Sequence, residues 1–105
     1  MKEITALELQ KFREKNIPHQ LIDIREIHEL EICSIQGDHI PMGEIVDRSD
    51  EIRTDIPVIF HCRSGARAAA VIMTLQKKFK FKNLYNLCGG ILAWAEEVDH
   101  SLEQY

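Results

Sequence analysis

Short apolar runs alternate with amphipathic segments along this chain. Three runs, Gln20–Ile24, Val58–His61 and Asn83–Leu87, contain the β-branched and aromatic residues that are typical of buried strands. The stretch Arg67–Lys78 instead repeats apolar residues at helical spacing and ends in lysines, which predicts an amphipathic helix. Strands separated by helices indicate an α/β fold with a mainly parallel sheet.

Weaker patterns fill the rest of the chain. Thr5 and Glu8 have the spacing of a capping box, so we expect a helix from Ala6 to about Lys15, ended by Asn16 and Pro18. Four further segments are predicted: a helical turn or two at Glu26–Glu31, a short strand near His39–Ile40, a short helix at Asp47–Arg53 and a last helix at Ile91–His100. We therefore predict one domain, residues 1–105, with about five strands and helices on both faces of the sheet.

Charge and cysteine content exclude several classes of function. The net charge of −4 argues against binding to nucleic acid. The odd set Cys33, Cys62 and Cys88 lacks a CxxC pair, so we expect neither a disulfide framework nor a bound metal. No signal peptide is visible and no apolar stretch approaches the ~20 residues that span a bilayer. We expect a cytoplasmic protein that does not bind membranes.

The candidate chemistry lies in the segment Val58–Arg67, where an apolar run ends on Cys62 and a short loop leads into the alanine-rich helix. Ligands of parallel sheets bind beyond the carboxyl ends of the strands, which is where Cys62 is expected. The start of a helix and the charges of Arg63 and Arg67 favour the thiolate, the reactive form of cysteine. Amides of the loop residues Arg63, Ser64, Gly65, Ala66 and Arg67 are expected to form an anion-binding nest, with Gly65 accepting a positive φ.

The length of this loop distinguishes two chemistries. Phosphotyrosine-type phosphatases have five residues between a cysteine and an arginine, whereas four separate Cys62 from Arg67. A small ring of N–H donors suits one sulfur atom better than a phosphoryl group. A phosphatase or arsenate-reductase-like enzyme and a non-catalytic docking module remain as alternatives, and so does a purely structural role for Cys62.

Three separated motifs occur in the order found in one enzyme family. They are Leu21–Glu26 (LIDIRE), Cys62–Arg67 (CRSGAR) and Asn86–Trp94 (NLCGGILAW). On these motifs the chain resembles a single-domain rhodanese, a sulfurtransferase. Three further segments are similar to the rhodanese domain at the C-terminus of molybdopterin-synthase sulfurylases: Glu31–Ile35, Ile40–Ile45 and Asp99–Tyr105. Ala68 and Cys88 depart from the family, which often has serine at the first position and glutamate or lysine at the second.

The resemblance implies a reaction in two steps without a cofactor. The Cys62 thiolate takes a sulfur atom from thiosulfate or a persulfide, and the enzyme persulfide passes it to cyanide, a thiol or a sulfur-carrier protein. We assign Arg63 and Arg67 to donor binding and loop charge, with a structural role as an alternative for Arg67. Asp23 and Arg25 are expected to pair beneath the loop.

Two residues near the predicted site have less certain roles. His61 precedes Cys62 in a strand and is expected to point to the other face of the sheet, as a core residue rather than a base. Cys88 ends a neighbouring strand, so it is a possible resolving thiol that attacks the Cys62 persulfide. The alternative is a small apolar residue beneath the Gly89-Gly90 turn.

Overall fold

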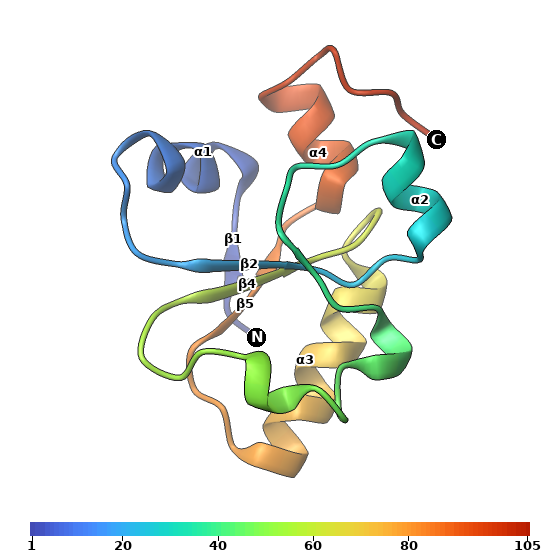
Figure 1. Ribbon diagram of the computed structural model, residues 1–105. Coiled ribbons are helices and arrows are strands. Elements are labelled where there is room, and N and C mark those ends of the chain that lie inside the picture. The colour runs from blue at the N-terminus through green and yellow to red at the C-terminus, as the bar shows by residue number, and fades with distance from the viewer.

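Five parallel strands form the centre of the computed structural model, which describes residues 1–105 (Figure 1). The strands are β1 (Glu3–Ile4), β2 (Gln20–Asp23), β3 (Asp38–His39), β4 (Val58–His61) and β5 (Leu84–Leu87). Their order across the sheet is β1-β5-β4-β2-β3, and every neighbouring pair is parallel. The predicted α/β fold with a parallel five-stranded sheet is confirmed, and β4 lies at its centre.

Helices cover both faces of this sheet (Figure 1). They are α1 (Ala6–Glu14), α2 (Ile27–Ile32), α3 (Ala66–Phe79) and α4 (Gly90–Glu97), with 3₁₀ turns η1 (Met42–Glu44) and η2 (Ser49–Glu51). α3 packs on one face, whereas α1 and α4 lie together on the other. The predicted capping box of Thr5 and Glu8 starts α1. None of the helices has the length and apolar character needed to cross a bilayer.

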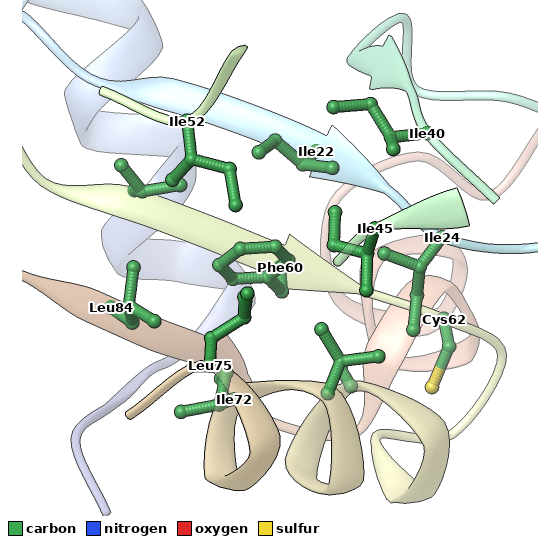
Figure 2. Close-up of a cluster of buried hydrophobic side chains, with 13 residues drawn as sticks. Ile22, Ile24, Ile40, Ile45, Ile52, Phe60, Cys62, Ile72, Leu75 and Leu84 are labelled. Atoms are coloured by element: carbon green, nitrogen blue, oxygen red, sulfur yellow. The ribbon is translucent and has the colours of Figure 1, made fainter. Parts of the chain in front are cut away.

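The alternation of side chains along β4 decides where Cys62 lies. Val58 and Phe60 point into the core beneath α3, whereas Ile59 points into the core beneath α1 and α4. Cys62 continues the first series and lies at the end of that cluster, where Figure 2 shows its sulfur beside the first turn of α3. The alternation of side chains between the two faces of the sheet thus places the thiol on the face that α3 covers.

Three sequence predictions differ from the structure. The sequence does not predict β1, because a strand of two residues is too short to show an alternating pattern. It forms because the amide of Asn86 in β5 donates to the carbonyl of Lys2, and the amide of Cys88 just after β5 donates to the carbonyl of Ile4. The helix predicted at Asp47–Arg53 is reduced to the single turn η2. The last helix ends at Glu97 rather than His100, since the amides of residues 98 and 99 both donate to the carbonyl of residue 94.

Candidate active site

Cys62 lies directly after β4, at the carboxyl edge of the sheet. Cys62 is 1% exposed, and its Sγ accepts a hydrogen bond from the backbone N–H of Gly65 at 3.1 Å. Gly65 has φ +108°, which turns the chain back over the sulfur and into α3. A side chain with a Cβ is strained at this φ, so glycine is needed here.

Free backbone amides surround the start of α3. The N–H of Gly65 donates to the sulfur. The backbone N–H groups of five neighbouring residues have no acceptor within the protein: Arg63, Ser64, Ala66, Arg67 and Ala68. The first N–H groups of any helix lack partners within the helix and carry a partial positive charge. The loop therefore offers several donors to an anion bound at Cys62.

Helix α4 holds the loop from the other side. The amides of Ile91 and Leu92 donate to the carbonyls of Cys62 and Arg63 at 2.9 and 3.2 Å. Gly90, with φ +62°, lies so close that any Cβ would overlap these two carbonyl groups. Asn86 of β5 adds a bond from its Nδ2 to the carbonyl of Gly65 at 3.1 Å. With its carbonyls bound from α4 and β5, the loop leaves its amides for a ligand.

Asp23 and Arg25 form the predicted ion pair at the end of β2. Both residues are buried, with Arg25 Nη2 2.8 Å from Asp23 Oδ2. Burial by itself would raise the pKa of Asp23, but hydrogen bonds from Arg25 keep this pKa below its ordinary value. Arg25 also donates to the carbonyls of Glu29 and Cys33 and so ties the end of β2 to α2.

Arg67 binds Glu29, a residue that the sequence analysis missed. Nη1 and Nη2 of Arg67 each lie 2.8 Å from a carboxylate oxygen of Glu29, in a two-point ion pair between α3 and α2. These bonds are the main reason that the pKa of Glu29 falls from 4.5 to about 2. The only sequence signal for Glu29 is its capping-box spacing after Glu26, and this spacing does not indicate a partner 38 residues away.

Arg63 differs from Arg67 in its surroundings. It is exposed, no ion pair engages it, and its guanidinium carbon lies 4.9 Å from the centre of the Tyr105 ring. Ser64, the next residue, is also exposed. Of Arg63 and Arg67, Arg63 is thus the one whose guanidinium N–H groups are free to bind an anion.

His61 is fully buried and lies on the face of the sheet opposite Cys62, as predicted. Burial lowers the pKa of His61 to about 4, despite the Asp23 carboxylate 3.5 Å from its Nε2. Neither ring nitrogen has a hydrogen-bond partner. A neutral, enclosed imidazole on the far face fits the predicted core role.

Cys88 lies just beyond β5 and is exposed, so it does not pack beneath the Gly89-Gly90 turn. The neighbouring carboxylate of Glu3 raises the pKa of its thiol. Its role as a resolving thiol stays a prediction. No three His, Cys, Asp or Glu side chains lie together in a way that would hold a metal ion.

The chain thus has a parallel α/β sheet with a cysteine loop between its central strand and the following helix. The chain belongs to the rhodanese-like domain family, which matches residues 5–97. Its fold is shared by a rhodanese-related protein from Thermoplasma volcanium, with a TM-score of 0.81, 27% identity and coverage of 93% of this chain and 94% of that one. A rhodanese-like domain protein from Staphylococcus aureus also has a TM-score of 0.81, with 28% identity and coverage of 100% and 99%.

Curated relatives include both short and long proteins. The uncharacterized protein YqhL of Bacillus subtilis (strain 168) is 37% identical over 90 residues, which cover 85% of this chain and 71% of the relative. The adenylyltransferase and sulfurtransferase MOCS3 of Drosophila ananassae is 30% identical over 109 residues, covering 94% of this chain. The match spans only 24% of that longer protein. The chain thus spans about a quarter of the length of its MOCS3 relatives.

Proposed function

We propose that this domain is a sulfurtransferase that carries sulfur as a persulfide on Cys62. The proposal is carried by one observation: the sulfur of Cys62 accepts the Gly65 amide at the start of α3, amid five N–H groups that have no other partner. Positive partial charge at a helix start stabilises an anionic sulfur, both as thiolate and as persulfide. Membership of the rhodanese-like family and the MOCS3 relatives support this chemistry.

In the first step the Cys62 thiolate attacks the outer sulfur of thiosulfate. A new S–S bond forms, the S–S bond of thiosulfate breaks, and sulfite leaves with the electron pair. Arg63, an exposed residue of the loop, binds the negative charge of the donor. Arg67 supplies positive charge and holds α2 against the loop through Glu29.

The second step transfers the outer sulfur to an acceptor. A nucleophile attacks that sulfur, the S–S bond breaks, and the Cys62 thiolate returns. Loop amides stabilise the charge on sulfur throughout, in the manner of an oxyanion hole. The MOCS3 relatives favour a sulfur-carrier protein as the natural acceptor, with cyanide or a small thiol as laboratory substitutes. We place the reaction in the cytoplasm, because all three cysteines are free thiols.

Mass spectrometry of the intact protein tests this function. After incubation with thiosulfate the wild-type protein should gain one sulfur atom, ~32 Da. The gain should be absent in Cys62→Ser and retained in Cys88→Ser, the matched control at the exposed cysteine. Cyanide should then remove the added mass and release thiocyanate.

The same preparation separates the alternative functions. Release of phosphate from an aryl phosphate without sulfur uptake would favour a phosphatase, and neither reaction would favour a docking module. Incubation of persulfurated protein with candidate carrier proteins, followed by a search for a C-terminal thiocarboxylate, identifies the acceptor.

A further inference from the structure

The segment after α4 returns to the active-site side of the molecule. Figure 1 shows the chain leaving α4 and ending beside α2. Tyr105, in this segment, is half-buried, and its hydroxyl joins two charged residues of the site. It accepts a hydrogen bond from Arg25 Nη1 at 3.0 Å and donates one to Glu29 Oε1 at 2.9 Å. No other tyrosine approaches the site in this way.

Both hydroxyl partners of Tyr105 are themselves fixed. Arg25 is fully buried and paired with Asp23, so it cannot move without breaking that pair. Glu29 is 7% exposed and bound at both oxygens by Arg67. The phenol is thus anchored at one end to groups that do not depend on substrate, and the orientation of its ring is set by them.

The ring also lies close to Arg63 of the loop. The guanidinium carbon of Arg63 lies 4.9 Å from the ring centre, within the range of a cation–π interaction. Arg63 has no ion pair, and an exposed arginine otherwise samples many rotamers. The ring restricts this exposed guanidinium to the neighbourhood of the Cys62 loop, while its N–H edges remain free to bind an anion.

We propose that Tyr105 is a positioning residue for the anionic sulfur donor: its hydroxyl locks the ring on Arg25 and Glu29, and the ring holds Arg63 beside Cys62. The inference rests on the proposed function for the identity of the donor. The positioning of Arg63 itself rests only on the contacts of Tyr105.

Steady-state kinetics with thiosulfate and cyanide test the proposal. In Tyr105→Leu the KM for thiosulfate should rise about two- to fivefold, the change expected for loss of an exposed cation–π contact, with kcat nearly unchanged. Tyr105→Phe keeps the ring and should give a smaller rise. In an Arg63→Ala background Tyr105→Leu should cause no further rise, because the side chain that it positions is gone.

Equal effects of Tyr105→Leu with and without Arg63 would overturn the proposal, and so would an unchanged KM. A general weakening of the fold would lower kcat or the melting temperature rather than act on KM through Arg63. If Tyr105→Leu does not fold, Arg63→Lys changes the other partner of the contact between the Arg63 guanidinium and the Tyr105 ring, at an exposed position. It keeps the charge but loses the planar stacking group, and the proposal requires its KM to rise.

Alkylation of Cys62 separates this inference from the proposed function. Peptide mass spectrometry gives the alkylation rates of Cys62 with anionic iodoacetate and neutral iodoacetamide. Cys88, which is exposed and whose neighbouring charges are those of Glu3 and Glu97, serves as an internal control. The iodoacetate-to-iodoacetamide rate ratio should fall at Cys62 in Tyr105→Leu and stay constant at Cys88. A fall without sulfur uptake by the wild type would refute the sulfurtransferase but retain the positioning role. Sulfur uptake by the wild type with an unchanged rate ratio at Cys62 in Tyr105→Leu would support the sulfurtransferase and refute the positioning role. A Cys62 that reacts with neither alkylating reagent nor thiosulfate would refute both proposals.

Discussion

The ion pair between Glu29 and Arg67 joins α2 to the first turn of α3, directly after the Cys62 loop, and Glu29→Gln tests its contribution to stability. The side chain of Glu29 is 9% exposed and that of Arg67 is 35% exposed. A pKa lowered from 4.5 to about 2 corresponds to an upper limit of roughly 3 kcal/mol in favour of the folded state. Because water screens the half-exposed Arg67, we expect a loss of about 1–2 kcal/mol in the variant at pH 7.

The pH dependence follows from the direction of this change. A lowered pKa means that the folded protein binds fewer protons at Glu29 than the unfolded chain does. The stabilisation is therefore complete above about pH 5 and is lost as the pH falls towards 2. At pH 3 the difference between wild type and Glu29→Gln should shrink to about half of its neutral value or less. Comparison with the variant also removes the contribution of Asp23, which titrates in the same direction.

Urea unfolding at pH 7, 5 and 3 measures these free energies. Glu44→Gln is the matched control, since Glu44 pairs with Arg48 on the surface with its side chain 58% exposed, and its loss should leave the unfolding midpoint nearly unchanged. A Glu29→Gln protein as stable as the wild type at pH 7, or a difference that does not depend on pH, would refute the role assigned to this pair.

Three further predictions concern residues around the loop. Between pH 7 and 4.5 the free energy of unfolding of the wild type should fall by on the order of 2 kcal/mol, because the pKa of buried His61 is about 4 and only the unfolded chain takes up the proton. His61→Phe should lose this fall in urea unfolding, and an equal dependence of the unfolding free energy on pH in both proteins would contradict the prediction. Gly90→Ala should cost ~2 kcal/mol or more and abolish sulfur uptake in the mass assay, because its Cβ would displace the loop, whereas Gly43→Ala, with open space around it, should have little effect. If Cys88 resolves the persulfide, attack on the inner sulfur of Cys62 releases sulfide and leaves a disulfide, so Cys88→Ser should abolish sulfide release; release at the wild-type rate would exclude the step.

Much of the site could be predicted from local sequence alone. The apolar run Val58–His61 followed by a loop and a helical pattern was sufficient to place Cys62 at the carboxyl end of a central strand. The alternation of side chains gave the burial of His61 on the other face, and the capping spacing of Thr5 and Glu8 gave the start of α1. These features depend on residues within a few positions of one another, and the backbone periods of 2 and 3.6 translate them directly into structure.

The tertiary structure alone decided which distant residues support the loop. Glu29 meets Arg67 across 38 residues, and Tyr105 meets Arg25 across 80. No local period encodes such pairs, because they arise only when the order of the strands brings α2, α3 and the segment after α4 to the same edge of the sheet. The two-residue strand β1 and the approach of α4 to the loop carbonyls have the same origin. Sequence therefore determined where the sulfur of Cys62 lies, whereas packing determined which groups hold its surroundings in place.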